Sequence, residues 1–536
     1  MLDPAGGKAP NYSSDHSPDR ATHKEQGLWL LERLVPDTGV YNVSVTFRVD
    51  GRLSLPAAER TLAVLLRRFE VLRTVFYSGE TELTKRILGP DEVTVEFEEL
   101  APGSDPDAAL RDFVSRPFEL HAQPLLRAGI LAAPDGDVCC IVVHHLVFDA
   151  ISATILLQDF VAVYDAVDAG QEAPAGLLEV VPALPESPPT EPGLAFWREH
   201  LAGFQPHSLD LGIGKRDSAR PTLIGGELFH PLSEELTLAV RRLQRGLRAP
   251  EAVILYAAFY LLLIGHGAER DLVVGTPVNR RPKGNLDAIG YHVSVAPLRA
   301  RAEPDLSFRQ LVVQTRNTFL SAIEHASVSL DDYLAELSRN GSSWRDTFTR
   351  HMFNYLSGLS LQPFAIGGMK AENVTVFSGF TKSDLEFFVV SAPDGIIIRA
   401  VYYAEIFEPD DVRLLLQRYE TLLSTLAADP EQLVGELPIW SARPEPAAVP
   451  AVLAEPAVEP DSELLAGLIA LWNQLLDRDD ADAQANFFTN GGHSMLAAVL
   501  AQKAGELTGV ELKLADVFAL PTPGELAVFI AARPLE

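Results

Sequence analysis

Apolar and polar positions follow one another along the chain in a way that predicts a mixture of strands and helices. Helices are expected where apolar residues recur every three or four positions, at residues 26–34, 55–70 and 150–169. Strands are expected where apolar and polar residues alternate or an apolar run is short, at residues 41–49, 125–131 and 138–143. The mixture is typical of an α/β (α+β) fold.

A second region of the same make-up follows a proline-rich connector at residues 174–192. Its expected helices and strands lie at residues 233–247, 252–264, 272–275, 383–390, 396–403 and 410–427. Two similar halves predict a duplicated lobe, with one lobe at residues 23–180 and the other at residues 190–440. Residues 1–22 are polar and rich in proline and serine, so we expect them to be disordered.

A small helical domain is expected after a second linker, rich in proline and alanine, at residues 441–460. Apolar residues then recur every four positions, at Leu464, Leu468, Trp472 and Leu476. Thr522 and Pro523 provide the cap and the first-turn proline of a last helix. Residues 461–533 are therefore predicted to form a small all-α four-helix bundle.

The charge of the chain limits its partners. Lys and Arg total 44 against 73 Asp and Glu, a formal charge of −29, which disfavours nucleic acid and anionic membranes as partners. No run reaches the ~18 apolar residues of a membrane helix, and the first twenty residues do not resemble a signal peptide. The two cysteines are adjacent in an apolar run, so the reducing cytoplasm is the expected location.

The strand at residues 138–143 leads into His144 and His145, and Asp149 follows just before a predicted helix. Successive strand residues point to opposite faces, so one histidine is expected to react and the other to support it. A histidine at the end of a strand suits proton transfer or hydrogen bonding to an attacking group. By spacing alone, an inert pair is the more common outcome, and a metal site is not expected because no further ligands stand at recognisable spacing.

Ser494 follows Gly491, Gly492 and His493 at the expected start of a helix. Its hydroxyl could simply cap that helix. It is also placed for modification by a phosphodiester, which the positive end of a helix dipole favours.

Together these residues resemble a nonribosomal peptide synthetase condensation domain followed by a peptidyl carrier protein. The stretch from His144 to Ala150 is similar to the family signature of two histidines, three variable residues, Asp and Gly, with Ala150 in place of Gly. Further motifs stand in the family's order, at residues 25–29, 68–76, 275–280, 289–291, 345–346 and 352–355. Phe69 occupies a position where the family usually has His.

The resemblance implies two chloramphenicol acetyltransferase-like lobes and the formation of an amide bond, by transfer of a carrier-bound acyl or peptidyl thioester to an aminoacyl acceptor. It places His145 as the catalytic residue, acting as a general base or only orienting the amine, with His144 in support. Asp149 would form a structural salt bridge with Arg280 or Arg281. Ser494 would carry 4'-phosphopantetheine.

The implied partners are an upstream donor carrier protein, a phosphopantetheinyl transferase and an adenylation enzyme acting in trans, unless the chain is a piece of a longer synthetase that contains the adenylation domain. The last is expected because only about twenty linker residues separate the two domains, and no Gly-rich nucleotide loop appears. Two alternatives stay open. One is an ester-forming, cyclising or releasing condensation domain, and the other is a domain that recruits partners without catalysis.

Overall fold

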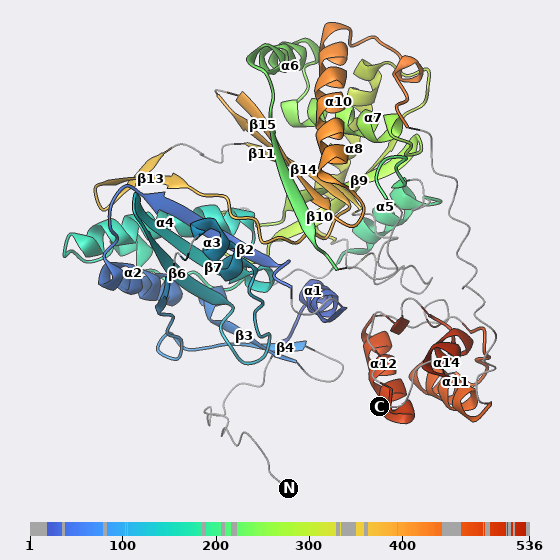
Figure 1. The fold of residues 1–536 in the computed structure, drawn as a ribbon, viewed down its shortest axis with the longest axis horizontal. Helices are drawn as coiled ribbons and strands as arrows, with labels where there is room; N and C mark the ends of the chain where they lie inside the picture. The colour runs from blue at the N-terminus through green and yellow to red at the C-terminus, as the bar shows by residue number, and fades with distance from the viewer. Residues whose placement is uncertain are drawn as a thin grey trace.

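The computed structural model (Figure 1) describes most of the chain. The described residues are 19–34, 38–78, 83–101, 103, 105–184, 189–204, 209–215, 222–282, 284–328, 333, 350–357, 363–393, 395–441, 462–476, 478–485, 487, 494–510, 512, 516–517 and 520–531. Residues 442–460 of the linker expected at residues 441–460, and the first 18 residues, lie outside them.

The first lobe is built on a six-stranded sheet with the order β12-β13-β2-β7-β6-β5, beside a small sheet β1-β4-β3 (Figure 1). In chain order its elements are β1 (Asp19–Arg20), α1 (His23–Leu34), β2 (Asn42–Val49), α2 (Leu55–Arg68), η1 (Glu70–Arg73), β3 (Thr74–Ser78), β4 (Leu83–Ile87), β5 (Phe97–Leu100), α3 (Pro106–Ser115), β6 (Leu126–Ala133), β7 (Gly136–His144), η2 (His145–Val147), α4 (Ala150–Asp168) and η3 (Ala175–Leu177). The two remaining strands of the six-stranded sheet, β12 (Phe364–Ile366) and β13 (Met369–Asn373), come from much later in the chain.

Strand β7 is buried along its whole length because helices cover both faces of the sheet. Ile141 packs in the same apolar core as Leu156 and Phe160 of α4. On the other face, Val142 packs in a smaller core with Phe113 of α3. This two-sided burial explains why the strand is a continuous apolar run. The strand places His144 and His145 at the end of a rigid element.

The second lobe has a six-stranded sheet with the order β10-β9-β11-β14-β15-β8, in which β11 runs parallel to β9 and β14. Its elements are α5 (Glu191–Leu201), β8 (Gly225–Pro231), α6 (Glu234–Leu247), α7 (Glu251–Gly265), β9 (Asp271–Asn279), β10 (Val293–Arg301), α8 (Phe308–Glu324), β11 (His351–Ser357), β14 (Leu385–Ala392), β15 (Gly395–Tyr403), α10 (Pro409–Ala428) and η7 (Val434–Glu436). Helix α7 is apolar all round because α6, α8 and α10 surround it.

Within the described residues, α4 has the length and composition that a membrane span needs, as does the bent pair α6 and α7 taken as one. Part of α4 and most of α7 lie in the interiors of the lobes. Phe160 and Val163 of α4 are fully buried, and nearly all of α7 is enclosed.

The helical domain contains α11 (Ser462–Leu476), α12 (Ser494–Thr508) and α14 (Pro523–Ala531) among the residues described. Trp472 of α11 is fully buried, and its ring meets that of Phe487 edge-on at 5.4 Å between centroids. Thr522 caps α14 by accepting a hydrogen bond from the Glu525 amide, as its sequence indicated.

The predicted helices and strands are present with ends displaced by a few residues, but two expectations about boundaries are wrong. Residues Asp19 and Arg20, which were expected to be disordered, form β1 and pair with β4. The expected boundary between the lobes, at residues 180–190, also does not separate the strands of the two sheets. Strand β13 pairs antiparallel with β2, with Ala371 opposite Val49, so a segment expected in the second lobe completes the first.

Candidate active site

The two histidines lie where β7 ends and a short 3-10 turn, η2, begins. The His144 amide donates to Leu125 and the His145 amide to Tyr41, at 2.9 and 2.8 Å, so both neighbouring segments fix the backbone. His144 is completely buried, whereas His145 is partly exposed. The two neighbouring histidines therefore differ in accessibility.

The ring of His144 is held at both nitrogens. Its Nδ1 accepts a hydrogen bond from the Leu146 amide at 3.2 Å, and its Nε2 lies 3.1 Å from Oε1 of Glu32 on α1. Because Nδ1 accepts, the proton must be on Nε2, which donates to the carboxylate. Glu32 was not found from the sequence, where it is one polar residue of an amphipathic helix.

His145 has a different environment. Its Nδ1 is buried and has no hydrogen-bond partner among the described residues. The ring of Tyr291, from the second lobe, meets it edge-on at 4.7 Å between centroids. Burial, and then the positive charge of Lys382, hold the pKa of His145 well below its usual value. The imidazole is therefore neutral near pH 7, with one ring nitrogen unused by the protein.

Asp149 caps α4, and its carboxylate binds Arg281 of the second lobe. Its Oδ1 accepts from the Ser152 amide at 2.9 Å and from Arg281 Nη2 at 2.7 Å, and its Oδ2 accepts from Arg281 Nη1 at 3.0 Å. The His292 amide donates to Oδ2 as well, at 2.9 Å. Arg281 is thus the partner that the sequence left open, while Arg280 donates to the Ser327 carbonyl instead.

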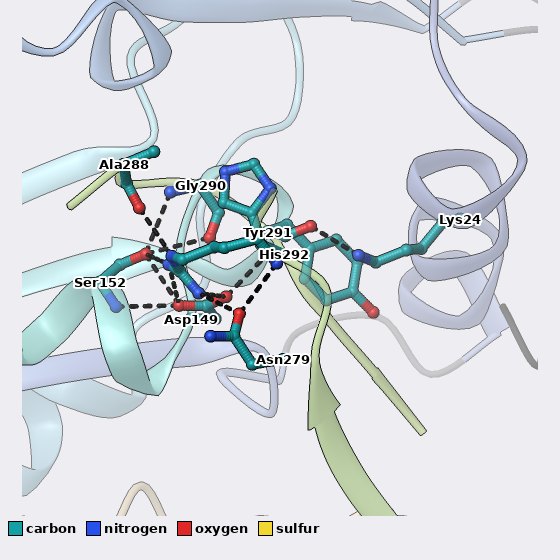
Figure 2. Close-up of polar contacts among 9 residues, drawn as sticks. Lys24, Asp149, Ser152, Asn279, Ala288, Gly290, Tyr291 and His292 are labelled. Atoms are coloured by element: carbon teal, nitrogen blue, oxygen red, sulfur yellow. Dashed lines mark hydrogen bonds and ion pairs between the residues drawn. The ribbon is translucent and has the colours of Figure 1, made fainter. Parts of the chain in front are cut away.

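Ser152 adds a second link between α4 and the loop that follows β9. Its hydroxyl donates to Asp149 and accepts from the Gly290 amide at 3.0 Å, beside the guanidinium of Arg281 (Figure 2). Burial alone would raise the pKa of Asp149, but the hydrogen bonds and charge of Arg281 outweigh it and lower that pKa. The carboxylate is therefore ionised and holds the loop that carries Tyr291.

The described residues contain no group of three or more His, Cys, Asp and Glu side chains able to hold a metal ion. Cys139 and Cys140 lie inside β7, both fully buried. Burial raises the pKa of each thiol, that of Cys140 to about 11. Neither cysteine takes part in the site.

Ser494 is the first residue of α12, a helix of 15 residues. The glycines and His493 that precede it lie outside the described residues. A helix N-terminus presents unpaired amide groups and a positive dipole, which suit a phosphodiester attached there. The position fits the attachment of 4'-phosphopantetheine.

Two family profiles match the sequence in the expected order. One, described as a condensation domain, matches residues 20–445. The other, described as a phosphopantetheine attachment site, matches residues 466–530 and indicates a covalently attached 4'-phosphopantetheine.

Known relatives agree with these matches. The phosphinothricin tripeptide synthetase PhsC of Streptomyces viridochromogenes is 29% identical over 447 residues, which cover 80% of this chain and 41% of that protein. The probable non-canonical nonribosomal peptide synthetase CymA of Salinispora arenicola is 26% identical over 440 residues, covering 79% of this chain and 6% of that protein. The chain therefore spans less than half the length of these two curated relatives.

Solved structures share the fold. The X-domain from teicoplanin biosynthesis superimposes with a TM-score of 0.68 at 21% identity, covering 80% of this chain and all of that one. The first condensation domain of the calcium-dependent antibiotic synthetase gives a TM-score of 0.64 at 21% identity, covering 78% and 98%. These similarities confirm the expected two-lobed architecture. With a profile match over most of its length, this chain belongs to the condensation-domain family of nonribosomal peptide synthetases and carries a phosphopantetheine attachment domain after it.

Proposed function

We propose that the chain forms an amide bond, transferring an acyl or peptidyl group from a donor carrier protein to an aminoacyl group held on its own carrier domain. The observation that carries this proposal is the state of His145. It is a neutral imidazole whose Nδ1 has no hydrogen-bond partner among the described residues, and it lies against Tyr291 of the other lobe. A buried polar atom without a partner is uncommon in folded proteins and often marks a site that a ligand completes.

In this proposal His145 accepts a hydrogen bond from the attacking amine. A depressed pKa makes it a weak base, so full removal of a proton from an ammonium ion would be strongly uphill. This favours an orienting role, in which the ring holds an uncharged amine in line with the acyl carbon. The new C–N bond then replaces the C–S bond, and the amine proton leaves with the departing thiol.

Ser494 is the proposed attachment residue. When bound there, 4'-phosphopantetheine would supply a flexible arm ending in a thiol that holds the acceptor as a thioester. The start of α12 at this serine supports the assignment, because the first amides of the helix face an attached phosphate. Tethering raises the effective concentration of the acceptor at His145.

The proposed partners are an upstream donor carrier, a phosphopantetheinyl transferase that loads Ser494, and an adenylation enzyme. Residues 442–460 are too few to hold an adenylation domain between Ser441 and α11. We therefore place adenylation on a separate protein or on another part of a longer synthetase. The relatives are compatible with the second choice, since this chain covers 41% of the length of PhsC.

A recruiting role is the second candidate, because the solved X-domain that shares this fold is also described in complex with OxyB. An ester-forming or cyclising reaction would use the same His145 with a hydroxyl nucleophile. The reaction assay separates these possibilities, because each leaves a product of different mass on the carrier, or none.

The test loads Ser494 with an aminoacyl group, presents an acyl-carrier donor, and follows the mass of the carrier-bound product. His145→Ala is expected to lower the rate on the order of a hundredfold or more. The control is His230→Ala, which removes a histidine paired with Glu420 on α10 of the second lobe. Equal rates for wild type and His145→Ala would refute the catalytic assignment.

Attachment is tested with coenzyme A and a phosphopantetheinyl transferase. The intact protein should gain the mass of one arm, and Ser494→Ala should abolish this gain. Ser462→Ala is the matched control, since Ser462 also begins a helix of the carrier domain and is exposed. A mass gain that survives in Ser494→Ala would place the arm elsewhere.

A further inference from the structure

Helix α1 reaches both rings beside His145. Near its C-terminal end, Oε1 of Glu32 lies 3.1 Å from Nε2 of His144. Near its N-terminal end, Nζ of Lys24 lies 3.6 Å from the centroid of the Tyr291 ring and donates to the Tyr291 carbonyl at 2.5 Å (Figure 2). The two residues are eight positions apart, about two helical turns, so they project from similar sides of one rigid element.

Two contacts of His144, one with the Leu146 amide and one with Glu32, favour the same tautomer of its ring. The Leu146 amide needs a lone pair on Nδ1, which leaves the proton on Nε2, facing the carboxylate. Leu146 belongs to η2, the same turn that carries His145. The ring of His144 therefore links the carboxylate of α1 to the backbone that sets the direction of His145.

Glu32 does not fit a purely stabilising role. Its second oxygen, Oε2, is buried and has no hydrogen-bond partner among the described residues. A buried acceptor left without a donor costs folding free energy. Its side chain is 11% exposed, so water offers it little compensation.

Lys24 is equally unusual for a surface helix, since only 3% of it is exposed. Its ammonium contacts the main chain and the ring of Tyr291, and that ring packs edge-on against His145. Tyr291 belongs to the second lobe, so α1 connects the reaction centre across the seam between the lobes.

We infer that α1 is the positioning element of the reaction centre. Glu32 is a positioning residue that keeps His144 in its Nε2–H form, and Lys24 is a positioning residue that holds Tyr291 against His145. The consequences for rate rest on the proposed function, whereas the protonation of His144 can be measured without any activity.

The test compares Glu32→Gln with Glu32→Leu. The glutamine keeps an oxygen that can accept the Nε2–H hydrogen bond, and the leucine has none. Nitrogen-15 NMR of labelled histidine, with His144→Asn to identify the signal, reports which ring nitrogen is protonated. We expect the wild-type form in Glu32→Gln and a mixed or altered form in Glu32→Leu.

Condensation on the loaded carrier gives the second readout. Glu32→Leu should lower kcat by roughly ten- to a hundredfold, with KM for the donor carrier unchanged, because a small displacement of His145 spoils attack geometry. Glu32→Gln should stay within about threefold of wild type if the hydrogen bond is sufficient. Glu25→Gln is the matched control, since it removes a carboxylate of α1 that pairs with Lys85 instead.

Several outcomes would overturn the inference. One is an unchanged His144 signal in folded Glu32→Leu, and another is a loss of activity in Glu32→Gln as large as in Glu32→Leu. If Glu32→Leu does not fold, Lys24→Met gives the second test, and it should lower kcat and shift the Tyr291 ring resonances. A wild-type protein without condensation activity would refute the proposed function, while the NMR result would still decide the positioning role.

Discussion

Asp149 and Arg281 form a buried, two-pronged ion pair between residues 132 positions apart, with N–O distances of 2.7 and 3.0 Å. Their side chains are 2% and 0% exposed. The pair joins the N-terminus of α4 to the loop after β9 and therefore fastens one lobe to the other beside His145.

Replacing Arg281 with Met should lower the free energy of unfolding by about 3–5 kcal/mol, because Asp149 would keep a buried charge without its partner. Arg280→Met should cost less than about 1 kcal/mol, since Arg280 is half-buried and donates to the Ser327 carbonyl. Urea unfolding measures both. A double variant, Asp149→Asn with Arg281→Met, should be less destabilised than Arg281→Met, and the opposite order would contradict the argument.

Stability should fall as the pH drops from about 6.5 toward 4. Burial lowers the pKa of four histidines to about 4: His200, His266, His292 and His351. In this window the unfolded chain binds more protons than the folded one, so the free energy of unfolding rises with pH and is lost on acidification. The urea midpoint at pH 5 should lie below that at pH 7, with a shallower dependence in His351→Gln. An equal midpoint at both pH values would disprove this.

Gly136→Ala should destabilise the first lobe by ~3 kcal/mol or more. Gly136 has a φ of +135°, and an added Cβ would lie 1.8 Å from the Val49 carbonyl oxygen. The backbone of β2 would have to move, and β7 with it. Gly176→Ala is the control, because nothing lies within 4 Å of its Cβ position. Thermal unfolding of the two variants should separate them, and matched melting temperatures would not fit this account.

The two native cysteines should not react with thiol reagents at pH 8 in the folded protein, because the reactive thiolate is disfavoured and both side chains are enclosed. Attachment of 4'-phosphopantetheine should then create one accessible thiol, which Ser494→Ala removes. Counting thiols before and after loading, with and without urea, provides the measurement. Labelling of Cys139 or Cys140 in the folded, unloaded chain would show that β7 opens.

Much of this site follows from local pattern. The continuous apolar run of β7 and the cap at Asp149 were both expected from spacing. The sequence could not show whether Arg280 or Arg281 binds Asp149, because that depends on the backbone conformation of the loop. The Arg280 amide pairs with the His292 carbonyl, which leaves Arg281 facing Asp149.

The contacts of α1 were also beyond prediction. Its apolar spacing gives the helix, but Glu32 meets a residue 112 positions away and Lys24 one 267 positions away. Such partners are determined by how the lobes pack. The sequence contained only a weak indication of these contacts, namely a Lys and a Glu two turns apart on an amphipathic helix.

The late position of β12 and β13 in the chain affects how the first lobe folds during synthesis. Lys370 and Asp50, which hydrogen-bond at the edge of the first sheet, are separated by 320 positions. A ribosome must therefore release most of both lobes before β2 gains its outer neighbour, and until then its bare edge can pair with other nascent chains. Chaperone binding to this edge before residue 371 is made would favour correct folding, and a chain cut short of β13 would be prone to aggregate.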